Sequence, residues 1–176
     1  MDISRKKGVY VMESWEKFIE NFKNYELTDN KEKYSFRLSN QELFRSGAFF
    51  LCIGILGGIS LKQSLDQNNT FKIGVAILLI LYALYSLMKT FLFNIKITNN
   101  NIKYGKYIIE FSNIKSASVK VARVSFSKMG RCLEIITNDR KKFVIRLNIH
   151  DVAKFLKIVQ NNLGERLLIA DEEKSI

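Results

Sequence analysis

The sequence predicts an α+β membrane protein, in which a two-helix transmembrane hairpin precedes a small antiparallel β-barrel-like domain capped by a C-terminal helix. Three observations support this fold class. Two long uncharged apolar runs lie in the first 93 residues, apolar and polar residues then alternate, and the last apolar residues return to helical spacing. The expected division is an N-terminal helix and strand at 1–38, a hairpin at 39–93, the β domain at 94–164 and an acidic tail at 165–176.

The segment before the hairpin combines a helix and a strand. Its first apolar residues recur at helical spacing: Met12, Trp15, Phe18, Ile19 and Phe22. The polar face of this amphipathic helix is slightly acidic, whereas helices that lie on anionic membranes are rich in lysine and arginine there. We therefore expect it to pack against its own protein or a partner. The alternation of Tyr34, Phe36 and Leu38 predicts a short strand over 33–39.

The two uncharged runs have the composition of membrane helices. Residues 46–61 and 73–88 each provide sixteen uncharged positions, about 24 Å of helix against a hydrocarbon core of about 30 Å. Apolar neighbours extend them to spanning length, at about 43–61 and 72–93. Two helices buried in a soluble core are the alternative, but a domain this small would have to enclose both on every side. Ser39 and Glu42 form a capping-box pattern that opens the first helix.

The polar connector at 62–72 is short, so the two helices are expected to run antiparallel as neighbours. Small residues let membrane helices approach closely. The small residues expected at the contact are Gly47, Gly54, Gly58, Gly74 and Ala83. Packing within one hairpin is the prediction, and association between copies of the chain, giving a homo-oligomer, is the alternative.

Flanking charges predict the orientation of the hairpin. Four bases lie on its terminal sides: Arg37, Arg45, Lys89 and Lys96. The connector has only Lys62 and Lys72, with Asp66 between them, and residues 94–176 carry sixteen bases against eight acids. The positive-inside rule then predicts a multi-pass protein of the cell (inner) membrane with both termini in the cytoplasm.

After residue 93 the apolar period changes to two, which predicts strands. The triple asparagine at 99–101 marks a turn, and Gly105 separates two short strands. The clearest hairpin pairs Leu133 and Ile135 with the strand that contains Phe143, Ile145 and Leu147, around a turn at 138–141. A final helix is predicted from apolar residues at helical spacing, with Gly164 as its C-cap. Those residues are Val152, Phe155, Leu156, Val159 and Leu163.

Three segments together resemble a known family. They are "YIIEFSNIKSASVKVAR" (107–123), "CLEIITNDRKKFVIRL" (132–147) and "HDVAKFLKIVQNNLGE" (150–165). They look like the bacterial pleckstrin-homology-like (PH-like) domain that directly follows a transmembrane hairpin, and the resemblance covers residues 34–163. It implies a cytoplasmic-facing β-barrel-like module on a membrane anchor, a family in which an activity is rarely assigned.

The residues show no pattern of catalytic chemistry. Cys52 and Cys132 have no disulfide or metal-site spacing and are expected to be free thiols. His150, the one histidine, adjoins Asp151, and adjacent positions cannot form a nucleophile–base–orienter set. The acids Glu110, Glu134, Asp139 and Asp151 are expected on solvent faces or turns. We therefore predict that the protein is not an enzyme and binds no metal or cofactor.

Basic residues are the remaining candidates for function. The expected contacts with an anionic surface are Lys96, Lys103, Lys106, Lys120, Arg140, Lys141, Lys142 and Arg146. The main expectation is a solvated face beside an anionic leaflet of the lipid bilayer, and a specific lipid or acidic protein partner is the alternative. Nucleic acid is not expected as a partner, because no aromatic residues interleave with these bases as stacking platforms.

These observations predict a membrane-anchored, non-catalytic interaction module whose cytoplasmic domain binds a partner protein or an anionic lipid surface. An immunity protein that protects the membrane against a cognate toxin is the alternative that chain length and architecture leave open.

Overall fold

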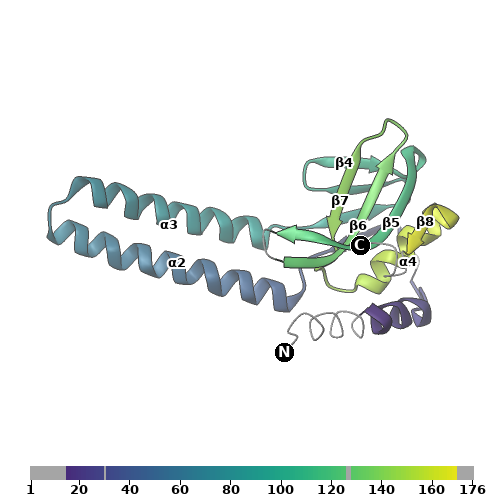
Figure 1. The fold of residues 1–176 in the computed structure, drawn as a ribbon, viewed down its shortest axis with the longest axis horizontal. Helices are drawn as coiled ribbons and strands as arrows, with labels where there is room; N and C mark the ends of the chain where they lie inside the picture. The colour runs from purple at the N-terminus through teal and green to yellow at the C-terminus, as the bar shows by residue number, and fades with distance from the viewer. Residues whose placement is uncertain (1–14, 30, 126–127, 170–176) are drawn as a thin grey trace, which may run out of the picture. The chain divides into compact units, whose positions relative to one another are not determined.

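The structure, a computed structural model, describes residues 15–29, 31–125 and 128–169 (Figure 1). The chain divides into two compact units. Residues 37–94 form the hairpin unit, and residues 1–36 with 95–176 form the sheet unit.

The hairpin unit consists of α2 (Asn40–Asp66) and α3 (Thr70–Phe91). The Ser39 hydroxyl accepts a hydrogen bond from the Glu42 N–H at 3.3 Å, so Ser39 is the N-cap that the sequence predicts. The connector is shorter than predicted, because α2 continues through residues 62–66 and only 67–69 turn the chain. These five residues include no glycine or proline that would end a helix. Both helices are long and apolar enough to cross a membrane.

The contact between α2 and α3 uses a different set of small residues from the predicted one. A Cβ at Gly54 would lie 3.7 Å from the Ala83 Cβ, so this pair does face one another. A Cβ at Gly57 would lie 2.9 Å from the Ile80 Cγ1, whereas Gly47, Gly58 and Gly74 have open space at that position. Residues three and four positions from Gly54 both adjoin it on the helix surface. The observed packing places position 57, not 58, against α3.

The sheet unit contains two four-stranded sheets (Figure 1). The first has the order β1 (Lys33–Phe36), β2 (Ile95–Thr98), β3 (Asn101–Tyr104), β4 (Tyr107–Glu110). The second has the order β7 (Lys142–Arg146), β6 (Lys128–Thr137), β5 (Ile114–Ser125), β8 (Leu167–Ile169). All neighbours are antiparallel except β5 and β8, which run parallel.

Two strand pairings change the expected division of the chain. Phe36 lies opposite Ile95, so β1, which precedes the hairpin, is an edge strand of the sheet that follows it. The division at residue 38 therefore separates strands that belong to one unit. β8 pairs with β5, so residues 167–169 are part of the sheet unit and not of a tail. Both pairings join segments far apart in sequence, which local periodicity does not report.

The core of the sheet unit lies against α4 (Val152–Leu163), whose residues Phe155, Leu156 and Val159 are fully buried. The Phe36 ring meets the Phe155 ring edge-on at 5.3 Å, which fixes β1 to this helix. Gly164 is the C-cap of α4, with a φ of +57° and a ψ of −128°. This lies outside the left-handed α region, but glycine adopts such a positive φ without a Cβ penalty. The predicted helix and its C-cap therefore both occur.

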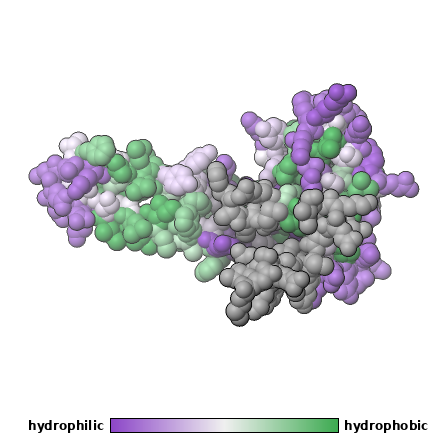
Figure 2. Space-filling model, in the orientation of Figure 1, coloured by the Kyte–Doolittle hydropathy of each residue, from purple (hydrophilic) through white to green (hydrophobic). Residues whose placement is uncertain are grey.

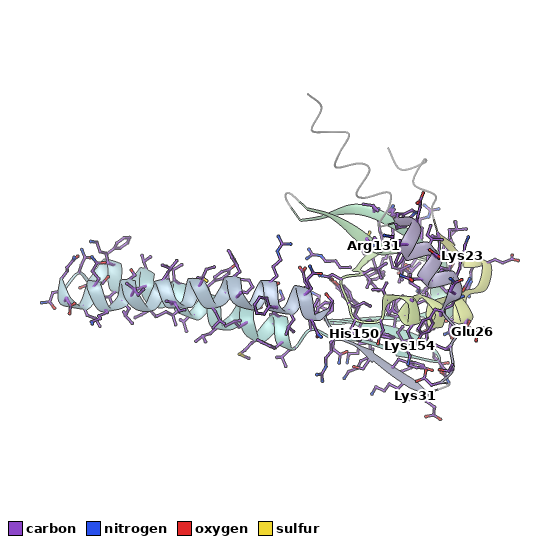
Figure 3. All side chains as sticks on the ribbon, turned by 90° about the horizontal axis from the view of Figure 1, so that it is seen from below. Lys23, Glu26, Lys31, Arg131, His150 and Lys154 are labelled. Atoms are coloured by element: carbon purple, nitrogen blue, oxygen red, sulfur yellow. The ribbon has the colours of Figure 1, made fainter. Side chains whose placement is uncertain are left out.

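The N-terminal helix, described over residues 15–24, packs on the sheet unit. Trp15, Phe18 and Phe22 are buried. Arg131, which is labelled in Figure 3, has its guanidinium 4.5 Å from the Phe18 ring centroid. Further along, the Lys154 ammonium pairs with the Asp29 carboxylate at 2.9 Å. The helix therefore contacts its own protein, one of the two expected outcomes. Met12, which was also expected on its apolar face, lies outside the described residues.

Candidate functional site: the groove between β4 and β7

Among the described residues, β4 is an edge strand of the first sheet and β7 is an edge strand of the second, and a groove lies between these two edges. We call it the β4–β7 groove. Its volume is about 590 Å³, within the range of about 300–1,000 Å³ typical of ligand sites. The lining residues are Tyr104, Tyr107, Ile108, Lys141, Lys142, Phe143 and Val144.

The apolar side chains of the groove are unusually open to solvent. Tyr107 is 47% exposed, Ile108 63% and Val144 43%. Gly105, with a φ of +58°, allows the two-residue turn that places Tyr107 opposite Tyr104. The Tyr107 ring also packs edge-on against Phe143 at 5.5 Å. Contiguous exposed apolar surface of this kind marks binding sites more often than isolated exposed residues do.

Lysines border this apolar surface. The Lys106 ammonium lies 5.4 Å from the centroid of the Tyr107 ring, and Lys141 and Lys142 line the groove directly. Lys141 pairs with Asp139 at 2.7 Å. A hydrogen bond from Lys141, with a second one from Thr137, lowers the pKa of the Asp139 carboxyl to about 2. This pair is exposed and therefore contributes little to stability.

Glu134 was expected on a solvent face, but the structure buries it. Its residue surface is only 8% exposed, and its carboxylate pairs with Lys120 at 2.7 Å and Lys142 at 2.6 Å. Burial alone would raise the pKa of Glu134, but the hydrogen bonds from the two lysines outweigh it and lower that pKa. β6 is an inner strand, so long side chains from both neighbouring strands can reach across and cover a carboxylate there.

The eight predicted basic residues do not form one cluster. Lys106, Lys141 and Lys142 gather at the groove, and Lys120 joins Lys142 through Glu134. Arg146 is exposed at the end of β7, and Arg140 occupies the β6–β7 turn with a φ of +60°.

Lys96 and Lys103 lie opposite one another on β2 and β3, and neither lines the groove. The apolar side chains of the groove were not predicted from the sequence. One feature of the sequence could have indicated them: the consecutive apolar residues Ile108 and Ile109 interrupt the period of two.

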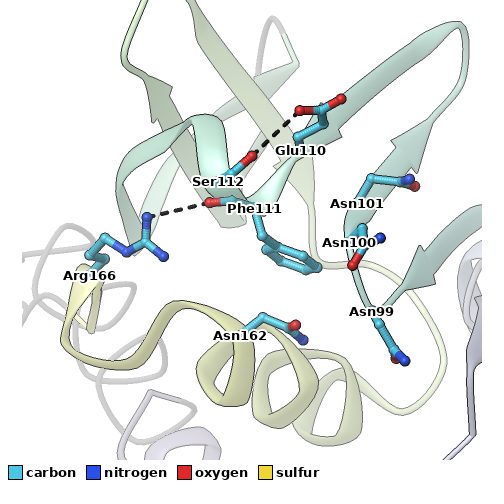
Figure 4. A pocket seen from close by; sticks show the side chains of 8 residues that line it. All are labelled: Asn99, Asn100, Asn101, Glu110, Phe111, Ser112, Asn162 and Arg166. Atoms are coloured by element: carbon cyan, nitrogen blue, oxygen red, sulfur yellow. Dashed lines mark hydrogen bonds between the residues drawn. The ribbon is translucent and has the colours of Figure 1, made fainter.

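A second, polar pocket of about 560 Å³ lies between the β2–β3 turn, the turn after β4, and the end of α4 (Figure 4). It is lined by Asn99, Asn100, Asn101, Glu110, Phe111, Ser112, Asn162 and Arg166. Its one cation is already engaged, because Arg166 donates to the carbonyls of Ile114 at 2.7 Å and Phe111 at 3.4 Å. We therefore assign Arg166 a structural role that ties the chain after α4 to the turn before β5.

Among the described residues, no group of three His, Cys, Asp or Glu side chains is placed to hold a metal ion. His150 Nδ1 lies 2.8 Å from the Asp151 carboxylate, and both side chains are exposed. The two cysteines are free, as the spacing predicts, and burial raises the pKa of the Cys132 thiol. The thiolate, which is the reactive form, is thereby disfavoured.

Comparison of the chain with protein-family models, with curated proteins and with solved structures found no match.

Proposed function

We propose that the protein is a membrane-anchored interaction module, in which the hairpin unit spans a bilayer and the sheet unit binds a partner at the β4–β7 groove. The observation that carries the proposal is the surface of the hairpin. Only 11% of the most apolar window of either helix is buried. Most of these apolar side chains therefore lie outside the core of this chain, which supports a bilayer around them. Figure 2 shows hydrophobic side chains along the middle of the hairpin and hydrophilic ones at its turn.

Chain connectivity supports a location of the sheet unit on one side of such a bilayer. β1 ends at Phe36 and α2 begins at Asn40, while α3 ends at Phe91 and β2 begins at Ile95. Both entrances to the hairpin therefore come from the sheet unit. The excess of bases in residues 94–176 supports the cytoplasmic side for this unit and for both termini.

Cysteine labelling in intact cells tests this topology. In a C52A/C132A background, an impermeant maleimide should label Gln67→Cys, in the turn between α2 and α3, and should not label Lys115→Cys on β5. Both positions are exposed in the structure, so access depends on the membrane. Opening the cells with detergent should make both positions react. Equal labelling in intact cells, or release of the protein from membranes by alkaline carbonate, would contradict the proposal.

A further inference from the structure

The hydrogen-bond pattern of β7 shows which of its backbone groups face the groove. The Thr137 N–H donates to the Lys141 carbonyl at 3.0 Å, and the Leu147 N–H donates to the Arg131 carbonyl at 3.0 Å. In an antiparallel ladder, hydrogen-bonded pairs alternate with non-hydrogen-bonded ones. Phe143 and Ile145 therefore bond to β6, and the N–H and C=O groups of Lys142, Val144 and Arg146 point to the open side.

The same argument applies to β4. The Phe111 N–H donates to the Asn100 carbonyl at 2.9 Å. This bond has the register of the β3–β4 ladder, in which Ile102 lies opposite Ile109 and Tyr104 opposite Tyr107. These pairs are therefore the hydrogen-bonded ones, and the backbone groups of Ile108 point away from β3. Within the described part of the chain, the two strands that border the groove thus both present backbone donors and acceptors without a strand partner, which is the template for an added strand.

We propose that the β4–β7 groove is a strand-addition site for an extended acidic segment of a partner protein. This inference deepens the proposed function and rests on it. An added peptide strand would supply the N–H and C=O groups that these edges need, whereas lipid headgroups offer no such repeating pattern. Exposed Tyr107, Ile108 and Val144 would supply the apolar contact.

Charge selects an acidic segment. No Asp or Glu lines the groove among the described residues, while Lys141 and Lys142 do. Asp139 offsets the charge of Lys141, and one Glu134 carboxylate is shared by Lys120 and Lys142. Together with Lys106 beside Tyr107, this leaves net positive charge at the groove. Arg146 adds another exposed cation further along β7.

The register of β7 predicts the spacing of the ligand. Lys142, Val144 and Arg146 project from one face of the strand, because side chains alternate with a period of two. A strand paired with β7 would place every second side chain beside them. The expected pattern is acidic, any residue, apolar, any residue, acidic.

The test uses the full chain in nanodiscs of zwitterionic lipid. The probe is the fluorescent peptide Thr-Glu-Thr-Val-Thr-Glu-Thr, capped at both ends, and the control peptide has lysine in place of both glutamates. Fluorescence anisotropy should show saturable binding of the acidic peptide and at least tenfold weaker binding of the basic one. Equal binding of the two peptides, or none of either, would overturn the proposal.

A matched pair of variants tests the backbone role. Val144→Pro removes an N–H that points into the groove and leaves the hydrogen bonds of Phe143 and Ile145 to β6 in place, and proline is tolerated on strand edges. It should weaken binding about tenfold, the effect of one lost hydrogen bond. Val144→Thr, which keeps the N–H, should bind within about twofold of the parent, since exposed substitutions have small effects.

Thermal unfolding of both variants checks that the fold persists. If Val144→Pro unfolds at a lower temperature than the parent, the backbone role is tested with the parent chain and a peptide that is N-methylated at alternate residues. Undiminished binding of that peptide would overturn the proposal.

Three other outcomes also count against it. The first is undiminished binding to a folded Val144→Pro variant. The second is competition by phosphatidylglycerol nanodiscs but not by unlabelled acidic peptide, which would make a lipid the ligand. The third is peptide-independent dimerisation that Val144→Pro abolishes, which would make a second copy the occupant. The labelling of Gln67→Cys is independent of all of these, so failure of the groove proposal is separable from failure of the membrane anchor.

Discussion

At the scale of single residues, Glu134 shows how a carboxylate is held inside a small sheet domain. The two lysines that bond to it are themselves partly exposed, whereas the Glu134 side chain is only 10% exposed. Removing one partner from a buried charge cluster usually costs more than forming the cluster contributes, because the remaining charges lose their counter-ion.

We therefore expect Glu134→Gln to lower the free energy of unfolding by about 1–3 kcal/mol at neutral pH, since the partly exposed lysines recover some hydration. Glu110→Gln, at an exposed position, is the control and should change it by less than about 0.5 kcal/mol. Chemical unfolding of both variants in detergent, followed by circular dichroism, measures the difference. Equal stability of the two variants would show that the Glu134 cluster contributes no net stability.

The pH dependence of this cluster has a definite sign. The folded pKa of Glu134 lies below the ordinary value of 4.5, so its contribution is fully present above that value. It is lost as the pH falls through the lowered folded pKa, because both states then bind the proton. The stability gap between the parent chain and Glu134→Gln should accordingly shrink as the pH falls below 4.5.

At the scale of elements, the hairpin depends on one close approach between α2 and α3. A side chain at Gly57 would overlap the root of the Ile80 side chain, which cannot move away without a change of rotamer or backbone. Position 58 faces open space. Two neighbouring glycines on one helix therefore differ in what they tolerate.

Gly57→Leu should destabilise the hairpin by about 1–3 kcal/mol through overpacking, and Gly58→Leu should change it by less than about 0.5 kcal/mol. Thermal unfolding of each variant in detergent micelles, monitored by the helical circular dichroism signal, checks the prediction. A larger effect at Gly58 would mean that this position meets another copy of the chain, the alternative that the spacing of small residues leaves open.

At the scale of the whole molecule, the sheet unit is assembled from both sides of the hairpin. β1 contributes the buried side chains of Tyr34 and Phe36, and Phe155 packs against Phe36. Burial of a large apolar side chain contributes about 1.5–3 kcal/mol. A fragment that begins after the hairpin would lack both of these side chains and the edge strand itself.

The position of Phe36 opposite Ile95 suggests a direct test. A chain in which residues 37–94 are replaced by a short Asn-Gly turn should fold as a soluble domain, because β1 and β2 then form an ordinary β-hairpin. A fragment of residues 95–176 should be less stable by several kcal/mol or remain unfolded. Chemical unfolding of the two purified proteins compares them. Equal stability would show that β1 is dispensable.

The sequence by itself determines the elements of this protein. Sixteen-residue uncharged runs predict the two helices of the hairpin. The alternation in residues 133–147 predicts the inward-facing side chains of the clearest strand pair, and Leu133, Ile135, Ile145 and Leu147 are indeed buried. The spacing of apolar residues and Gly164 predict α4 and its end. These features depend on neighbours within one or two turns of helix or within one β-hairpin. The local periodicity of apolar residues is therefore enough to predict them.

The tertiary structure decides what depends on distant partners. The place of β1 beside β2, the parallel pairing of β8, and the burial of Glu134 beneath two lysines all join segments separated along the chain. The choice of Gly57 over Gly58 follows from the position of Ile80 on the other helix. The β4–β7 groove exists only because the edges of two sheets meet, and no local pattern specifies which edges remain unpaired.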